Sequence, residues 1–502
     1  MKTQGDTKRP RCVKAQFDPE FSATPLGGAV LVEKTMRSLR LRRIIGEHLP
    51  ARSEDAQYSM TDGAYALMAA MIVGGRGIAA ADCLRQDDLA REIFGLEKGA
   101  PSPPTTYRIL CDMSGLTERR AIDVYAPSGP RLPAMDLFGE PREVPKTRRI
   151  VPEEPEAAKP DSLDKQRKFL AALARRCHKA LPARHSRLHG WWVAFGDATD
   201  VEVEGNCFDA AREGRHGERI IRWMTLMLGP LTVAQELVAG NRDEGVAMPG
   251  LLKGAQETIG EMVGREGKVL GLFDAAYYEK QVTDLLSEMG WDFIVCANQQ
   301  RSALQHIAQG AMPEQWSATG PDAARGWAES QVGCFDHWPE GWVKPVTIVA
   351  RRWREEGELP GTWHYSFLAT RIDRGQLPAK LAKRYCSSIW MLYGTKQGRE
   401  NHYKTPLRDE GLHHPPSCRL GVDQAFYTLG AAASNVAMVL RYAVVEKSER
   451  GIELWRLRER YFRIAGYLVR TANTLTVRLS GICVDALRQT LWQSAFAAAG
   501  RL

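Results

Sequence analysis

The sequence predicts an α/β fold built on a mixed sheet, and three observations lead to this prediction. Residues 191–197 form an apolar run of strand length that ends in the acidic residue Asp197. The same design returns at residues 268–274, where an apolar run ends in Asp274. Segments with helical periodicity alternate with further apolar runs after these two strands, as in proteins whose sheets are covered by helices.

The elements around these two runs follow the order strand, strand, strand, helix, strand, helix, strand. After the first run, the strands at 201–203, 219–228 and 232–238 are predicted to complete a meander, and the later strands are separated by helices. The predicted strands are 191–197, 201–203, 219–228, 232–238, 269–273 and 291–296, and the predicted helices are 244–263 and 278–289.

Bulk composition describes a globular chain with a modest basic surplus. The 502 residues should form two or more domains, and the net charge of +8 is compatible with a nucleic-acid partner. The ten cysteines include no Cys-x2-Cys pair, which argues against a zinc ribbon and favours a reduced, cytoplasmic protein. No signal peptide is expected, and the longest apolar runs are shorter than the roughly 18 residues of a membrane span.

Residues 1–138 are predicted to form an all-α DNA-binding domain. Its basic first part carries eleven Lys/Arg against five Asp/Glu in residues 1–52. Several short helices lead to a Ser/Thr-rich helix start at residues 102–106, followed by Arg108, which is typical of helix-turn-helix domains. A plain helical bundle is the alternative. Further predicted helices cover residues 30–49 and 58–72.

A third acidic residue completes a candidate metal site. Glu400 lies in a helical segment that also contains Tyr393 and Lys396. Two aspartates at strand ends and one glutamate on a helix offer the oxygen ligands that hard divalent cations prefer. Two such cations, about 3.5–4 Å apart, support phosphodiester cleavage. The alternatives are that Asp197 only caps a turn, or that a neighbouring acid replaces it, namely Asp200 or Glu202.

With this triad, the chain resembles the DDE transposases of bacterial insertion sequences, which have a ribonuclease-H-like core. The closest resemblance is to the group numbered 1380, related to a wider group with a Tyr-x2-Arg-x3-Glu-x6-Lys signature. Tyr393, Lys396 and Glu400 keep the first spacings, with Lys in place of Arg, whereas Leu407 stands where the signature has Lys. The order of strands and helices also matches the ribonuclease-H-like pattern.

The resemblance implies a DNA transposase that binds terminal inverted repeats and performs cut-and-paste cleavage and strand transfer. Asp197, Asp274 and Glu400 would be the catalytic residues and would hold two Mg²⁺ or Mn²⁺ ions. Double-stranded DNA, at the element ends and the target, would be the partner of a homodimer. The residues expected at the DNA are Tyr393, Lys396, Lys404, Arg408 and Arg108. The lysines and arginines among them could instead belong to a solvated surface. A transposase-derived DNA-binding protein and a nuclease without strand transfer remain alternatives.

The rest of the chain is divided by composition and pattern. A linker and basic helix occupy 139–189, the core occupies 190–299 and 386–445, and a mostly β, tryptophan-rich insertion occupies 300–385. The last region, 446–502, is predicted to be helical. Its segment 452–470 is read as one amphipathic helix, with an apolar stripe of Leu457, Tyr461, Ile464 and Leu468 beside a row of arginines.

Overall fold

The structure is a computed structural model of the 502-residue chain. It describes residues 23–117 and 155–502, with the exception of 205–206, 215–216, 311–314, 472–473 and 482–483. Between 118 and 154 it describes only two short antiparallel pairs, β1 (Tyr125–Pro127) with β4 (Thr147–Arg149) and β2 (Leu132–Met135) with β3 (Pro141–Val144). The side chains of 118–154, 299, 399–404 and 474 are also outside the description, and most of the predicted linker therefore lies outside it.

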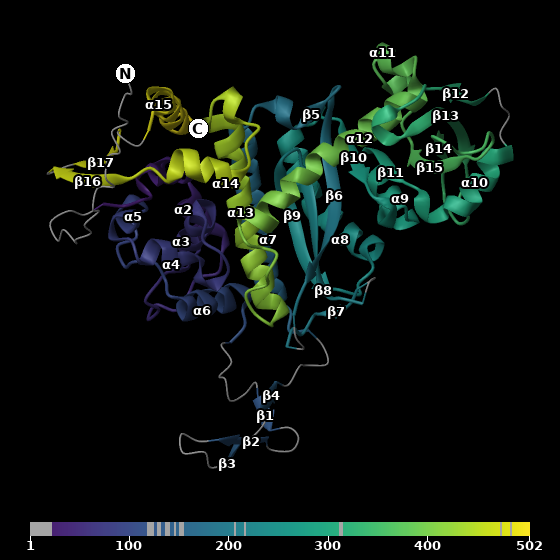
Figure 1. Cartoon of the computed structure of the whole chain (residues 1–502). Helices are drawn as coiled ribbons and strands as arrows, with labels where there is room; N and C mark the ends of the chain where they lie inside the picture. Colours follow the sequence, from purple (N-terminus) through teal and green to yellow (C-terminus); the bar gives the residue numbers. More distant parts are fainter. Residues whose placement is uncertain are drawn as a thin grey trace, which may run out of the picture.

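A mixed sheet forms the centre of the molecule (Figure 1). Its core order is β9, β8, β6, β10, β11. Strands β6, β10 and β11 are parallel, whereas β8 runs antiparallel to β6 and to β9. This is the ribonuclease-H-like arrangement, so the predicted fold class is confirmed. The strands are β6 (Trp191–Glu202), β8 (Arg219–Leu228), β9 (Leu231–Ala239), β10 (Val269–Phe273) and β11 (Asp292–Cys296).

Helix α13 (Leu420–Val439) is buried along its whole length and protects the free side of β9. Side-chain amides of α13 form the hydrogen bonds with the β9 backbone that a neighbouring strand would otherwise make. The Asn435 side chain bonds both the N–H and the C=O of Thr232, and the Gln424 side-chain oxygen accepts from the Leu237 N–H at 2.6 Å. Because unpaired strand edges are costly when buried, these bonds let the edge of the sheet sit inside the core.

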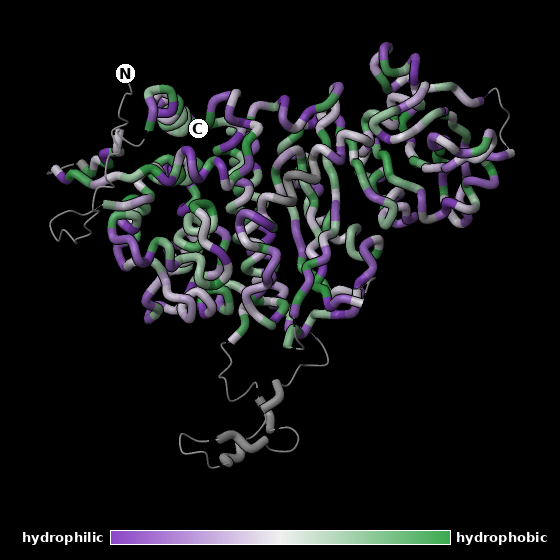
Figure 2. Tube along the Cα trace, in the orientation of Figure 1, coloured by the Kyte–Doolittle hydropathy of each residue, from purple (hydrophilic) through white to green (hydrophobic). Residues whose placement is uncertain are grey.

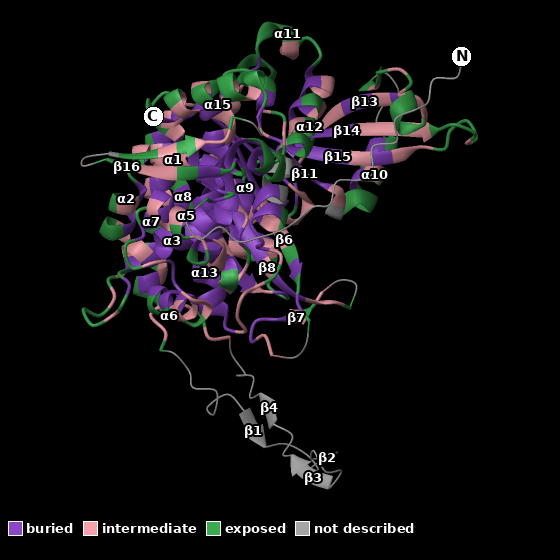
Figure 3. Cartoon of the chain, turned by 60° about the vertical axis from the view of Figure 1, so that its left-hand side comes forward, coloured by how far each residue is buried: buried purple, intermediate pink, exposed green. Residues whose placement is uncertain are grey.

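Several helices cover one face of the sheet, and helix α12 (Tyr385–Lys404) packs on the opposite face. Helix α7 (Pro160–Ala180) packs beside α13 on β9, and α8 (Glu244–Val263) packs on β8, β9 and the helix α9 (Lys280–Glu288). Buried residues gather where these helices meet the strands (Figure 3). Hydrophilic residues lie mainly on outer turns and loop ends (Figure 2). Among the described residues, no single helix is long and apolar enough to cross a membrane, although the bent pair Met60–Val73 and Ile78–Arg85 passes that test together.

The mostly β insertion continues the central sheet. Strand β15 (His364–Thr370) pairs antiparallel with β11, and β14 (Val346–Glu355), β13 (Trp327–His337) and β12 (Ser317–Ala318) follow in order. Together with β5 (Arg187–Leu188) and β7 (Arg212–Glu213) they make an eleven-stranded sheet. The helical parts of this region are α10 (Arg301–Gly310) and α11 (Ala379–Ala382).

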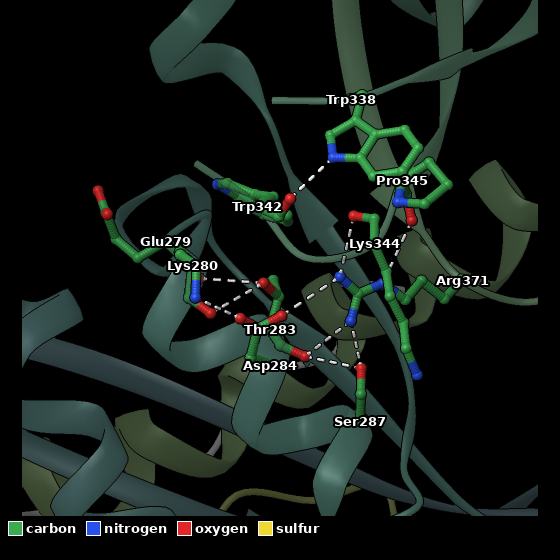
Figure 4. Close-up of polar contacts among 10 residues, drawn as sticks. All are labelled: Glu279, Lys280, Thr283, Asp284, Ser287, Trp338, Trp342, Lys344, Pro345 and Arg371. Carbon is green, nitrogen blue, oxygen red and sulfur yellow. Dashed lines mark hydrogen bonds and ion pairs between the residues drawn. The ribbon is translucent and has the colours of Figure 1, made fainter. Parts of the chain in front are cut away.

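Arg371 fastens this insertion to the core (Figure 4). Its guanidinium donates to the Thr283 carbonyl at 3.3 Å and lies 3.4 Å from the Asp284 carboxylate, both on α9. The same group also donates to the carbonyls of Lys344 and Pro345, just before β14. One planar cation with five donors therefore ties a core helix to the insertion.

The N-terminal helical region shares its core with the sheet domain. Helices α3 (Met60–Val73) and α6 (Pro103–Ser114) pack on α13, and α2 (Leu41–His48) packs on α7. The single helix expected at 30–49 is two helices, α1 (Val30–Ser38) and α2, because Arg40 between them adopts a left-handed φ of 58°. The remaining helices are α4 (Asp82–Arg85) and α5 (Asp88–Ile93).

Arg419, at the start of α13, bonds two separate parts of the chain. Its guanidinium contacts both Glu156 oxygens, at 2.8 and 2.9 Å, and donates to the Tyr107 hydroxyl of α6 at 3.2 Å. Only 2% of its side chain is exposed. A buried guanidinium requires such partners, so this contact fixes the helical region against the core.

The prediction of one helix over 452–470 is wrong for the second half of this segment. The structure has α14 (Leu454–Leu457), a π-helical turn at Arg458–Phe462, and then β16 (Gly466–Thr471), which pairs with β17 (Thr474–Leu479). Leu457, Tyr461 and Ile464 are buried against the chain's own core, which covers most of the predicted apolar stripe. Residues 466–471 form a strand because they pair with β17, which begins 8 residues after the start of β16. This pairing outweighs the local helical periodicity of the sequence. Helix α15 (Ala486–Ala499) ends the fold.

A buried polar cluster joins this C-terminal region to α3. Arg458 donates to the carbonyls of Met71 and Ile72 at the end of α3, and to the Asp409 carbonyl. Beside it, Glu410 is fully buried, and neither of its carboxylate oxygens has a hydrogen-bond partner. Burial raises the pKa of Glu410 to about 8, although the Arg458 charge opposes this shift. Glu410 is therefore protonated in the folded protein at neutral pH.

We expect Glu410→Gln to stabilise the protein at alkaline pH. The folded pKa lies above the usual value of 4.5, so stability present below pH 4.5 is lost as the pH rises towards about 8. The neutral amide carries no such loss. Thermal unfolding at pH 5.5 and 8.5 should show the melting-temperature gain growing with pH. Glu257→Gln on the surface of α8 is the control, and an equal gain at both pH values would contradict the prediction.

Candidate active site

Asp197 and Asp274 lie side by side because of the register between two parallel strands. In that register Val269 pairs with Trp192 and Leu272 pairs with Phe195. Continuing the same offset by two residues brings Asp274 level with Asp197. The two aspartates that end the apolar runs in the sequence are therefore neighbours in space.

Asp197 does not stand at the end of its strand, which corrects the prediction. Strand β6 continues through Asp197 to Glu202, because residues 194–202 stay paired with β8. Its other neighbour, β10, ends at Phe273, one residue before Asp274. Asp197 is thus placed where the parallel pairing stops. The predicted short strand at 201–203 is the continuation of β6.

Helix α12 (Tyr385–Lys404) brings a cation and a hydroxyl to these acids. The Lys396 Nζ donates to Asp274 Oδ2 at 2.8 Å and lies 4.0 Å from Asp197 Oδ2. The Tyr393 hydroxyl donates to Asp274 Oδ1 at 3.1 Å. Tyr393 and Lys396 are three residues apart, so they share one face of the helix. The Lys396 side chain is only 3% exposed, whereas that of Asp274 is 46% exposed.

Glu400 follows Lys396 by about one helical turn on α12. Its side chain, like that of Lys404, lies outside the described residues. Among the side chains that are described, no three acidic, histidine or cysteine residues form a ready metal site. Asp197 and Asp274 are brought together, and the helix of the third predicted ligand passes beside them.

The other residues predicted at the DNA occupy different places. Arg408 lies beyond the end of α12 and forms ion pairs with Asp409 at 3.2 Å and Glu453 at 2.8 Å. Arg108 is exposed on α6, in the N-terminal helical region. Tyr393 and Lys396 instead contact Asp274, so the structure places them inside the acid site.

The two acids considered as replacements for Asp197 have other surroundings. Asp200 forms a two-pronged pair with Arg222, at 2.7 and 3.1 Å. Glu202 is exposed at the end of β6. Neither carboxylate is paired with Lys396 in the structure, whereas Asp197 and Asp274 both are.

Sequence reasoning missed Glu244, the first residue of α8. Its carboxylate lies 3.3 Å from Arg222. Burial is the main cause that raises the pKa of Glu244, and the negative charges of Asp200 and Asp274 add to it. Glu244 is thus close enough to Asp200 and Asp274 for their negative charges to act on it. Only the fold reveals this, because nothing in the local sequence distinguishes it from an ordinary helix-start glutamate.

A pocket opens beside Asp274. Lys396, Tyr393 and Trp390 line it from α12. Arg325 and Arg351 line it from the insertion. Acidic oxygens and cationic groups therefore meet in one hollow at the end of β10.

The donor set fits a hard divalent cation. Two carboxylates from neighbouring strands already share one positive charge, the Lys396 ammonium, so their oxygens converge on a point where a cation is favoured. Asp274 is partly open to solvent, which leaves a route of entry. Asp197 and Asp274 are the residues that would hold such an ion, with Glu400 as the third candidate.

Comparisons with known proteins give distant structural likeness only. No protein-family model and no curated protein sequence matches the chain. Among solved structures, the cryo-EM structure of a piggyBac transposase synaptic complex with hairpin DNA aligns with 87% of this chain and 79% of that chain. The sequence identity is 10% and the TM-score is 0.38. The insertion-sequence group suggested by the motif finds no support here and stays a prediction.

We expect Lys396→Met to destabilise the protein in the absence of divalent ions. Removing the buried ammonium leaves two carboxylates facing each other, at a cost of about 2 kcal/mol. Added Mg²⁺ or Mn²⁺ should then raise the melting temperature more in the variant than in the wild type. The measurement is a thermal-shift titration after chelation, with Lys253→Met on α8 as the control. Equal metal-induced shifts in variant and wild type would contradict the expectation.

Proposed function

We propose that the chain is a DNA transposase that cuts and rejoins phosphodiester bonds at Asp197, Asp274 and Glu400. The observation that carries this proposal is the meeting of Asp197 and Asp274, in register on two parallel strands, under the helix that bears Glu400. The ribonuclease-H-like strand order supplies the frame. Because both aspartates are held by paired strands of one sheet, their positions do not depend on a loop.

The proposed chemistry consists of two in-line phosphoryl transfers. Water attacks the phosphorus, the bond to the 3′ oxygen breaks, and the leaving oxygen takes a proton to become a 3′-hydroxyl. The oxygen of that hydroxyl then loses its proton and attacks a phosphorus of target DNA. The bond from this phosphorus to the target's 3′ oxygen breaks, the released oxygen takes up a proton, and the new bond joins the strands. When bound, divalent cations supply Lewis acidity for the attacking and leaving oxygens.

The chain's own residues orient the acids for this task. The Tyr393 hydroxyl holds one oxygen of Asp274, and Lys396 holds the other. Lys396 also compensates the paired negative charges before a cation arrives. Asp197 is fixed within β6 by its pairing with β8. We infer that a homodimer carries out the joining of two DNA ends, with Mg²⁺ or Mn²⁺ as cofactor.

We expect Asp197→Asn, Asp274→Asn and Glu400→Gln each to lower DNA cleavage by at least a hundredfold while DNA binding persists. Each change removes one anionic oxygen ligand and preserves side-chain size. The assay incubates the full chain with DNA that carries the sequences flanking its gene, in Mg²⁺ or Mn²⁺, and resolves cut and joined products.

Glu202→Gln is the matched control, since this acid lies on the same strand but is exposed and away from Lys396. Wild-type cleavage by any one triad variant would remove that residue from the site. Cleavage without joined product would instead favour a nuclease, and binding without either product would favour a DNA-binding derivative.

A further inference from the structure

Two arginines of the insertion face the pocket that contains Asp274. Arg351 lies on β14, and Arg325 ends the short turn Ala323–Arg325 before β13. Both line this pocket together with Asp274 and Lys396. Arg325 helps to lower the pKa of Arg351, whereas Asp322, which lies 3.5 Å from the Arg325 guanidinium, opposes this shift. Two like charges beside one hollow favour a bound anion between them.

The Arg351 guanidinium is held by aromatic rings. Its central carbon lies 4.2 Å from the centre of the Trp390 ring on α12 and 5.7 Å from that of Trp327 on β13. Burial is the main cause that lowers the pKa of Arg351 to about 10, and it stays charged at neutral pH. Within the described part of the chain, no hydrogen bond or ion pair to its guanidinium is found. The rings fix the plane of the cation and leave its donors for a ligand.

The next residue on β14 shows the contrast. Arg352 points to the opposite face of the strand, where Trp316 and Trp363 flank it at 4.1 and 4.4 Å. It donates two hydrogen bonds to the Gln331 side-chain oxygen. Arg352 therefore serves the packing of the insertion. Only Arg351 of the two reaches the pocket beside Asp274.

A second hollow adjoins the first and is also cationic. Arg351 and Ser387 line both hollows, so the two lie next to each other. The second one is lined by Arg374 and by two exposed residues at the start of α12, Lys383 and Arg384. We call these five residues the cationic strip: Arg325, Arg351, Arg374, Lys383 and Arg384. The strip runs from the acid pair along the N-terminal half of α12.

We propose that the cationic strip binds the sugar-phosphate backbone of the DNA strand whose scissile bond lies at Asp197 and Asp274. The guanidinium fork of Arg351 matches two phosphate oxygens, and the ring contacts hold it in the plane that this contact needs. A row of cations along two neighbouring hollows suits the repeated phosphates of a strand better than a single small anion. This inference rests on the proposed function and adds a binding surface to it.

The strip differs from the DNA contacts expected from the sequence. None of its five residues belongs to that set. Arg408 lies past the opposite end of α12 and is paired with two acids. Because backbone phosphates carry no base identity, the strip should bind without sequence preference.

The test measures DNA binding by the full chain over a salt series. Arg351→Ala should weaken binding of a fluorescent duplex roughly tenfold and reduce the slope of log affinity against log salt by about one, because one phosphate contact is lost. Arg325→Ala should act in the same direction. Arg351→Lys should keep the slope, since the charge remains, while affinity falls. Chelator in the buffer prevents cleavage during these measurements.

Arg352→Ala is the matched control, since it removes a neighbouring arginine from the same strand but the opposite face. An unchanged slope in both Arg351→Ala and Arg325→Ala overturns the strip. Equal loss in Arg352→Ala also overturns it, because the effect would then come from the fold of the insertion. Melting temperatures identify any variant that fails to fold, and Arg325→Ala then replaces Arg351→Ala.

The strip and the proposed function fail in different ways. Salt-dependent binding that Arg351→Ala weakens, with no cleavage by the wild type, supports the strip and overturns the transposase assignment. Cleavage by the wild type with unchanged binding in the strip variants overturns the strip alone. Absence of DNA binding by the wild type overturns both.

Discussion

The parallel pairing of β6 with β10 is the constraint on which the candidate site depends. The register carries Asp274 level with Asp197, although 76 residues separate them in the chain. A slip of one residue would turn the side chain of one strand to the other face. Both strands are apolar and buried on both faces up to these acids, so the acids are the first polar residues that the pairing brings together.

Placing two acids together creates an electrostatic cost that the helix α12 offsets. The Lys396 ammonium is buried and has to be compensated, and the two carboxylates repel each other unless a cation lies between them. The Lys396 ammonium and the two carboxylates therefore stabilise one another. The same contact positions α12 over the sheet, and with it the turn that bears Glu400. A site with this arrangement is ready to exchange one positive charge for another.

Other parts of the molecule contact this sheet at the β9 edge and at the side of the insertion. Helix α13 seals the β9 edge through side-chain amides, and Arg419 ties it to the N-terminal helices. At the other end the insertion extends the same sheet, and Arg371 fastens it to α9. The acids and the arginines of the insertion therefore belong to one continuous framework. Elements built on a shared sheet keep their spacing better than loops do.

The sequence by itself determined the elements with strong local patterns. The strand Arg219–Leu228, the helix Glu244–Val263 and the strand Val269–Phe273 begin and end where periodicity placed them. The two aspartates were recognised because apolar runs stop at them. Tertiary structure alone decided that β6 continues past Asp197, that Lys396 is buried between two acids, and that 466–471 is a strand. Each of these depends on a partner far along the chain, and a local pattern contains no information about such a partner.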